Sequence, residues 1–308
     1  MFPREVRVGT RASLLALAQT RWVIARLQEA APGVRFTVVT VRTEGDRDRS
    51  TPLPAMGGRG VFVREVERRL LQGDIDLAVH SLKDLPTEET PGLTVAAVPV
   101  REDPRDALVS RDGAALEALP PGAAVGTGSP RRRAQLAFAR PDLVFVSVRG
   151  NVDTRVEKAA RGELDAVVLA MAGLVRAGIR APAKPIPFEL CLPAAGQGAL
   201  ALQVREGDRA MERLAGLIDD GATHAAVRCE RELLRRLGGG CHAPVAAYCR
   251  PEGGAWAFDA CVGLPDGSRL VRASSREAAP EAARDAVYLR LMEKGGQELL
   301  KEAERAGG

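Results

Sequence analysis

The chain reads GDIDLAV at residues 73–79 and GELDAVV at residues 162–168. In each copy a glycine and an acidic residue lead to an aspartate that is followed by an uninterrupted aliphatic run. A glycine is typical of a tight turn, and a short aliphatic run is typical of a strand buried on both faces. The stretch therefore predicts the same turn and the same buried strand at two places in the chain.

Two more patterns occur twice, in the same order. VGT at residues 8–10 matches VGT at residues 125–127, and VVTVR at residues 38–42 matches residues 144–149. The spacings between the patterns differ, so the two copies share a plan but not a length. Ordered repeats of this kind predict two similarly built lobes.

Short β-branched runs alternate with amphipathic segments in both lobes. This alternation predicts parallel sheets covered by helices, and therefore an α/β fold. We expect strands at residues 35–41, 75–79, 94–98, 143–148 and 166–169, and helices at residues 13–29, 61–72, 130–139 and 153–161.

Three domains are predicted. The first comprises residues 1–98 and residues 199–217, because ALALQV at residues 199–204 is a strand-like run that returns the chain to the first lobe. The second comprises residues 103–193, so the chain crosses twice between the lobes, and we expect a hinge with a ligand cleft. The third comprises residues 219–308, a smaller α+β domain with a helix at 222–237, strands at 246–250, 255–264 and 269–274, and a final helix at 280–306.

The composition is that of a globular protein, with 45% hydrophobic and 27% charged residues. The N-terminus carries charges where a signal peptide needs an apolar run, and no stretch reaches the roughly 18 apolar residues of a membrane span, so we expect a cytoplasmic protein. Only 4% of residues are aromatic and the net charge is +4, which argues against nucleic-acid binding. The five cysteines lack the paired spacing of zinc sites, and their odd number argues against a disulfide framework.

Arginines dominate the basic residues, since only five of the 44 are lysines. Taken singly, each is best read as a solvated surface residue. Three of them, at residues 131–133, lie at the start of a predicted helix that Ser129 caps. Positive charges at a helix N-terminus are unfavourable because the positive end of the helix dipole lies there, and an anion bound between them removes this conflict. Because guanidinium groups bind carboxylates in a bidentate manner, we expect a ligand with several carboxylates or phosphates. The arginines at predicted strand or helix ends are Arg11, Arg131, Arg132, Arg149, Arg155 and Arg176.

Two further residues are candidates for the chemistry. Asp84, next to Lys83, follows the strand predicted at residues 75–79, where it is placed either for proton transfer or for a structural ion pair. Cys241 follows three glycines, which allow backbone and ligand to approach closely. Together with His242 it also resembles a nucleophile and base, although no orienting carboxylate is evident.

Six motifs occur along the chain in this order: GTRxS at 9–13, HSxKDxP at 80–86, GTxSxRR at 126–132, RGNxxTR at 149–155, GQGA at 196–199 and GGC at 239–241. Together they resemble the motifs of the porphobilinogen deaminases, also called hydroxymethylbilane synthases, and the resemblance covers about the whole chain. It implies two lobes like those of periplasmic solute-binding proteins, a third domain, and a monomer. It also implies a transferase that condenses four porphobilinogen molecules head to tail, with release of ammonia, to give hydroxymethylbilane for haem biosynthesis.

The resemblance assigns roles to individual residues. It implies a dipyrromethane cofactor, made from the substrate and held by a thioether to Cys241. Asp84 assists proton transfer and stabilises the cation left when ammonia departs. The residues implied to bind the cofactor are Ser81, Lys83, Thr127, Ser129, Arg131, Arg132 and Arg155, and those implied to bind the substrate and the growing chain are Arg11, Ser13, Gln19, Arg149, Arg176 and Gln197.

Residues 53–62 match the mobile active-site loop of the family. Its residues here are Gly57, Gly58, Arg59, Gly60 and Phe62. Family members often carry lysine where this chain has Ala55 and Arg59, so no loop lysine is expected to contact the substrate.

Two other functions remain open from the sequence. One is a two-lobed polyanion-binding protein without catalysis, against which Asp84 and the Cys241 loop argue. The other is a hydrolase that uses Cys241 and His242.

Overall fold

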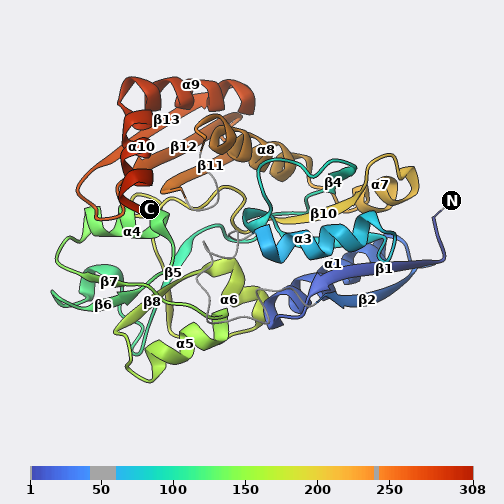
Figure 1. Ribbon diagram of the computed structural model, residues 1–308, viewed down its shortest axis with the longest axis horizontal. Coiled ribbons are helices and arrows are strands. Elements are labelled where there is room, and N and C mark those ends of the chain that lie inside the picture. The colour runs from blue at the N-terminus through green and yellow to red at the C-terminus, as the bar shows by residue number, and fades with distance from the viewer. Residues whose placement is uncertain (1, 42–59, 239–242, 308) are drawn as a thin grey trace. The chain divides into compact units, whose positions relative to one another are not determined.

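The structure is a computed structural model that describes residues 2–41, 60–238 and 243–307. Its strands form two five-stranded sheets and one three-stranded sheet (Figure 1). The chain divides into unit 1, which comprises Met1–Glu102 and Ala199–His224, and unit 2, which comprises Asp103–Gly198 and Ala225–Gly308. Among the described residues, no helix is long and apolar enough to cross a membrane.

Unit 1 is built on a sheet with the strand order β2-β1-β3-β10-β4. β1 lies parallel to β2 and β3, whereas β10 lies antiparallel to β3 and β4. The predicted return of the chain to the first sheet is therefore confirmed. The elements are β1 (Glu5–Arg11), α1 (Leu14–Ala30), β2 (Arg35–Val41), α3 (Gly60–Leu71), β3 (Leu77–Ser81), η1 (Leu82–Asp84), β4 (Leu93–Ala97), β10 (Leu200–Arg205) and α7 (Arg209–Gly216).

Unit 2 contains the second five-stranded sheet, with the order β7-β6-β8-β5-β9. β6 lies parallel to β7 and β8, and β5 lies antiparallel to β8 and β9. The elements are β5 (Asp106–Ser110), η2 (Leu116–Ala118), β6 (Ala124–Gly126), α4 (Pro130–Ala139), β7 (Val144–Val146), α5 (Val152–Ala160), β8 (Ala166–Ala170), α6 (Met171–Ala177) and β9 (Ala183–Pro185).

The C-terminal part of unit 2 is a three-stranded antiparallel sheet with helices packed on it, as expected for a smaller α+β domain. One final helix was predicted, but two are present. Gly295 has a φ of 79°, which favours glycine, and this turn ends the first helix. The elements are α8 (Gly221–Arg236), β11 (Val245–Glu252), β12 (Ala255–Gly263), β13 (Leu270–Glu277), α9 (Pro280–Glu293) and α10 (Gly296–Gly307).

The two five-stranded sheets repeat one plan, so the predicted pair of similar lobes is confirmed. Asp76 accepts a hydrogen bond from the backbone N–H of Arg7 at 2.9 Å, and Asp165 accepts one from Ala124 at 2.7 Å. These two aspartates hold the same position in the repeated stretch, residues 73–79 and 162–168, which leads into β3 and β8. Each one therefore joins the start of its central strand to the neighbouring strand of its own lobe.

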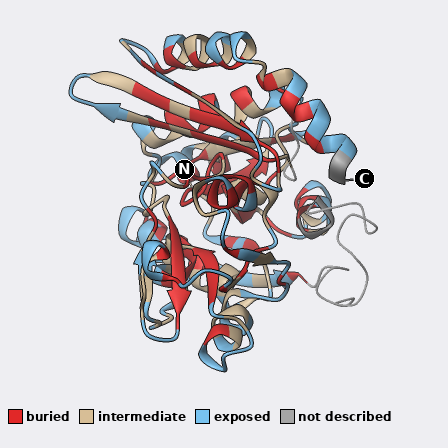
Figure 2. Cartoon of the chain, turned by 90° about the vertical axis from the view of Figure 1, so that its left-hand side faces the viewer, coloured by how far each residue is buried: buried red, intermediate tan, exposed pale blue. Residues whose placement is uncertain are grey.

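The sheets are mixed, whereas the alternation of strands and helices predicted parallel ones. The antiparallel strands are β10 in unit 1 and β5 in unit 2. Successive strands become parallel when a helix connects them as a crossover. Neither β10 nor β5 is connected to its neighbour in the sheet in this way, so both can run antiparallel. Both strands are buried along almost their whole length, and Figure 2 shows buried residues along strands as well as on helices.

The glycine of the repeated VGT pattern makes room for a core side chain. A Cβ atom at Gly9 would lie 2.1 Å from Cδ1 of Ile75, and one at Gly126 would lie 2.7 Å from Cδ1 of Leu164. Ile75 and Leu164 occupy the same position in the repeated stretch. Each lobe therefore uses one glycine to admit one aliphatic side chain between neighbouring strands.

Gly9→Ala is expected to lower the free energy of unfolding by about 1–3 kcal/mol, because the new methyl group overpacks a filled core. Ile75→Val removes the Cδ1 atom that the methyl group would meet, so the double variant should be more stable than Gly9→Ala alone. Urea unfolding of the two single variants and the double variant measures this coupling. Additive destabilisation would contradict the proposed close fit.

Candidate functional site

The predicted site residues of unit 1 lie at the carboxyl ends of β1 and β3, which are parallel neighbours. Arg11 is the last residue of β1, and Ser13 caps α1 by accepting a hydrogen bond from the backbone of Ala16 at 3.3 Å. Ser81 ends β3 and donates a hydrogen bond to the buried side chain of Gln19 at 3.0 Å. The structure thus brings the predicted substrate and cofactor residues of the first lobe to one edge of its sheet.

A short 3-10 helix, η1, presents Lys83 and Asp84 directly after β3. Leu82 and Leu85 are buried on either side, and the backbone N–H of Leu82 donates to the carbonyl of Ala199 at 3.0 Å. Because these two leucines anchor the turn, the half-buried Lys83 and Asp84 are held at the strand end. This is the placement that the sequence predicted for a proton-transferring carboxylate.

In unit 2, the start of α4 forms a second polar cluster. Ser129 caps this helix by accepting a hydrogen bond from the backbone of Arg132 at 3.5 Å, and its own N–H donates to Thr127 Oγ1 at 3.3 Å. Pro130 occupies the first turn, where its missing N–H is harmless. The sequence predicted this cap and helix start correctly.

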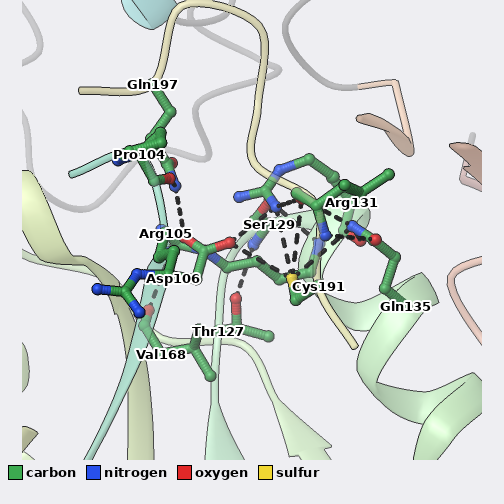
Figure 3. A network of polar contacts seen from close by, with 12 residues as sticks. Pro104, Arg105, Asp106, Thr127, Ser129, Arg131, Gln135, Val168, Cys191 and Gln197 are labelled. Atoms are coloured by element: carbon green, nitrogen blue, oxygen red, sulfur yellow. Dashed lines mark hydrogen bonds and ion pairs between the residues drawn. The ribbon is translucent and has the colours of Figure 1, made fainter. Parts of the chain in front are cut away.

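Two of the three arginines in that first turn, Arg131 and Arg132, are buried, whereas Arg133 is exposed. Arg131 Nη1 donates to Oδ2 of Asp106 at 2.8 Å, and Arg132 donates to Oδ1 through Nε at 2.9 Å and through Nη2 at 2.7 Å. Asp106 is fully buried at the start of β5 (Figure 3). The chain itself therefore supplies one of the negative charges expected near these arginines. The sequence did not predict this role for Asp106.

Asp106 could have been noticed as a lone acidic residue at the head of an otherwise apolar run, DALVS at residues 106–110. Burial disfavours ionisation, but the guanidinium groups of Arg131 and Arg132 outweigh it and hold the pKa of the Asp106 carboxyl well below its ordinary value. The group is therefore a carboxylate throughout the physiological range of pH.

Gln197 belongs to the same network. Its Nε2 donates to Oδ1 of Asp106 and to the carbonyl of Pro104, both at 2.8 Å, and only 1% of the residue is exposed. Gln197 therefore supports Asp106 in the structure, and its contact with the substrate stays a prediction.

Three further arginines predicted for the site lie elsewhere in unit 2. Arg149 is exposed beyond β7, and Arg155 lies in α5, with its Nε donating to the carbonyl of Gly150 at 2.8 Å. Arg176 lies in the last turn of α6. β6, β7 and β8 are neighbours in one sheet, so these arginines follow strands adjacent to the one that leads into α4.

Several predicted residues lie outside the described part of the chain. They are Cys241, His242 and the loop residues Gly57, Gly58 and Arg59. Of Gly60 and Phe62, the structure describes only the backbone, in the first turn of α3.

The four described cysteines are all buried in their own units. Burial raises the pKa of the Cys229 and Cys261 thiols to about 11, and it also raises the pKa of Cys191. Cys249 is 1% exposed. None of these four thiols is both accessible and acidic enough to act as a nucleophile near neutral pH.

His80, on β3, lies in a buried polar group in the core of unit 1. Gln203 Nε2 donates to Oε1 of Glu67 at 2.9 Å, and Thr90 donates to Oε2 of the same carboxylate at 2.9 Å. Burial lowers the pKa of His80 to about 4, although Glu67, Gln203 and Asp84 act in the opposite direction. His80 is therefore neutral in the folded protein at any pH above about 4.

This shift predicts a loss of stability in mild acid. An unfolded chain protonates this histidine below its ordinary pKa of 6.5, whereas the folded chain resists protonation down to about 4. His80 should therefore lower the free energy of unfolding by up to about 3 kcal/mol as the pH falls from 6.5 to 4. In His80→Gln that part of the pH dependence should vanish, as measured by unfolding midpoints across this range. Parallel curves for the two proteins would contradict the prediction.

Two family models together match nearly the whole chain. A family model described as "Porphobilinogen deaminase, dipyromethane cofactor binding domain" matches residues 6–213, and one described as "Porphobilinogen deaminase, C-terminal domain" matches residues 224–292.

The chain is similar to curated proteins named porphobilinogen deaminase. The protein of Moorella thermoacetica is 46% identical, covering 99% of this chain and 98% of its own length. That of Pelotomaculum thermopropionicum is 48% identical over 97% of both chains, and that of Desulforudis audaxviator is 48% identical over 99% of both. Among solved structures, the methionine binding protein MetQ covers 72% of this chain and 93% of its own, at 12% identity and a TM-score of 0.45.

Proposed function

The chain belongs to the porphobilinogen deaminase family, and from this premise we propose that it joins four porphobilinogen molecules head to tail, releases one ammonia at each step, and forms hydroxymethylbilane. The protein is thus an enzyme of tetrapyrrole biosynthesis, a transferase. The observation that carries the proposal is the family match, which extends from residue 6 to residue 292 with one short gap.

The residues at the start of α4 fit a cofactor that carries carboxylates. Ser129 and Thr127 carry hydroxyl groups at this capped helix start, and the helix dipole favours an anion there. Two arginines face one carboxylate, Asp106, so this cluster keeps one positive charge in excess. We propose that the dipyrromethane binds with its acid side chains at this helix start. The residues that would hold it are Ser81, Lys83, Thr127, Ser129, Arg131, Arg132 and Arg155.

We propose further that this cofactor is attached through Cys241. The support comes from the other cysteines, since the four described thiols are all buried and none can carry a group that must reach an active site. When bound, the cofactor supplies the pyrrole ring to which the first substrate unit is added.

Asp84 is proposed to handle the proton. Its carboxylate, held at the end of β3, would accept a hydrogen bond from a pyrrole N–H and take up the proton that the ring carbon loses when the new carbon–carbon bond forms. Once protonated, it would pass this proton to the next departing amine. The same negative charge stabilises the positive charge that develops on the pyrrole as the amine leaves. The residues proposed to bind the acid side chains of the substrate are Arg11, Ser13, Gln19, Arg149, Arg176 and Gln197.

The finer description of the protein is also a proposal. From the family resemblance we infer a monomer of the cytoplasm that acts on a small molecule and binds neither nucleic acid nor membranes. The low aromatic content of 4% and the net charge of +4 support the part that concerns nucleic acid. The proposed domains remain residues 1–98 with 199–217, residues 103–193 and residues 219–308.

Incubation of the purified protein with porphobilinogen tests the function. We expect four molecules of ammonia for each linear tetrapyrrole that forms. Tight binding of porphobilinogen without any ammonia release would instead favour a non-catalytic polyanion-binding protein.

A further inference from the structure

We propose that Asp106 is a positioning residue of the cofactor site, which holds Arg131 and Arg132 at the start of α4 so that a carboxylate of the pyrrole cofactor completes the cluster. The inference deepens the proposed function and rests on it. It assigns a role to a residue that belongs to none of the motifs that carry the family resemblance.

The geometry makes Asp106 the centre of the cluster. Its two oxygens accept hydrogen bonds from Arg131, Arg132 and Gln197, at distances of 2.7 to 2.9 Å, and the thiol of Cys191 lies 3.4 Å from Oδ2. Figure 3 shows the side chains of Arg131 and Gln197 reaching this carboxylate from different segments. One buried group thus sets the orientation of both guanidinium groups.

The two arginines are not held in the same way. All three side-chain nitrogens of Arg132 are engaged, because Nη1 donates to the carbonyl of Val168 at 2.9 Å while Nε and Nη2 donate to Asp106. Arg131 is held by Nη1 alone, which also donates to the carbonyl of Leu192. Among the described residues, Nε and Nη2 of Arg131 donate to no protein group. They are the donors that an incoming carboxylate can use.

The charge balance points to the same ligand. Asp106 neutralises only one of the two guanidinium groups, both of which are at least 94% buried. Gln135, Gln197 and the thiol of Cys191 add no charge, so one buried positive charge remains. Such a charge is costly in a protein interior unless an anion joins it.

The first lobe shows that the fold itself does not need these charges. Asp106 pairs with Ala170 of β8, and Leu200 pairs with Ser81 of β3. Ala170 and Ser81 both lie two residues beyond the repeated stretch, so Leu200 holds in the first lobe the position of Asp106 in the second.

The helix starts correspond in the same way. The caps Ser13 and Ser129 accept from Ala16 and Arg132, three residues further along each helix. Leu15 and Ala16 therefore stand where the second lobe has its two arginines. One lobe builds this strand and helix with three apolar residues and the other with one acid and two bases, so we attribute the charged set to a ligand.

The test compares four proteins purified from cells that make porphobilinogen: the wild type, Asp106→Asn, the triple variant Asp106→Leu/Arg131→Leu/Arg132→Ala, and the control Asp76→Asn. The triple variant carries the residue types that the first lobe has at the corresponding positions, Leu200, Leu15 and Ala16. The control removes a partly buried aspartate that pairs with Arg7 at 2.8 Å, away from the cluster. Intact mass gives the fraction of chains that carry a two-pyrrole adduct, and thermal unfolding reports the fold.

We expect the wild type and Asp76→Asn to carry the adduct on nearly all chains. In Asp106→Asn the loaded fraction should fall at least about tenfold, the factor that corresponds to losing one charge-assisted hydrogen bond. The triple variant should unfold at a temperature no lower than that of Asp106→Asn and should carry no adduct. A purely structural role would give the opposite pattern, with loading that follows thermal stability across the four proteins.

Full loading of Asp106→Asn or of the triple variant would overturn the proposal. A triple variant that does not fold would also overturn it, because the comparison between the lobes would then be wrong. A wild-type protein without any adduct would instead contradict the proposed function.

Discussion

Asp84→Asn is expected to lower kcat for porphobilinogen by about 10²–10⁴-fold, because an amide can neither transfer a proton nor stabilise a developing positive charge by its own negative charge. The change is nearly isosteric, and Leu82 and Leu85 hold the turn through their burial, so the fold should persist. Steady-state ammonia release measures kcat, and thermal unfolding checks the fold.

Asp74, ten residues before Asp84 on the other side of β3, provides a matched control for this variant. Asp74 is exposed in the turn that precedes β3, and Asp74→Asn should leave kcat unchanged. If Asp84→Asn turns over porphobilinogen at a rate near that of the control, Asp84 does not handle the proton. Intact masses of both variants show whether the cofactor is present, which separates a defect in catalysis from a defect in loading.

Cys241→Ser is expected to abolish the covalent adduct and, with it, formation of the linear tetrapyrrole. A hydroxyl is a much weaker nucleophile than a thiol near neutral pH, so the thioether has no counterpart in this variant. Loss of the anchor should reduce product formation to the background of the assay. Intact mass and product formation are measured on the same preparation.

The matched control is Cys229→Ser, in α8, where the thiol is buried. That variant should keep the adduct and lose about 1–3 kcal/mol of stability, since a hydroxyl replaces a thiol in an apolar core. An adduct that persists in Cys241→Ser but disappears in Cys229→Ser would show that the cofactor is attached to Cys229, and would contradict attachment through Cys241.

The local patterns of the chain were sufficient to predict most of the fold. The repeated stretch before β3 and β8 marks the two central strands because each copy has the same turn glycine, the same aspartate and the same core side chain position. α4 was predicted with its observed limits, since Ser129 and Pro130 specify its start through local hydrogen bonding alone. Features that depend on one residue and its neighbours are the ones that a sequence reveals.

What could not be predicted depends on partners far away in the chain. β5 was not recognised as a strand, and its antiparallel direction follows from pairing with β8, about 60 residues further on. The role of Asp106 likewise arises only when α4 and the segment around Gln197 meet it. The three arginines at a helix start predicted a bound anion, but the sequence could not show that a carboxylate of the chain, Asp106, already pairs with two of them.

The boundary between α9 and α10 was missed for a different reason. The sequence at residues 280–306 is compatible with one long helix, and only the positive φ of Gly295 separates the two. A glycine within a helical pattern is ambiguous, because it is tolerated in a helix interior at a cost of about 1 kcal/mol and is also the preferred helix terminator.

The intact mass of the wild-type protein, purified from cells and compared with the mass of the unmodified chain, tests the central claim most directly. We expect a single species heavier by two linked pyrrole units, and a peptide digest that locates this addition on the segment containing Cys241. A protein that converts porphobilinogen to hydroxymethylbilane while its mass is that of the bare chain would contradict the claim.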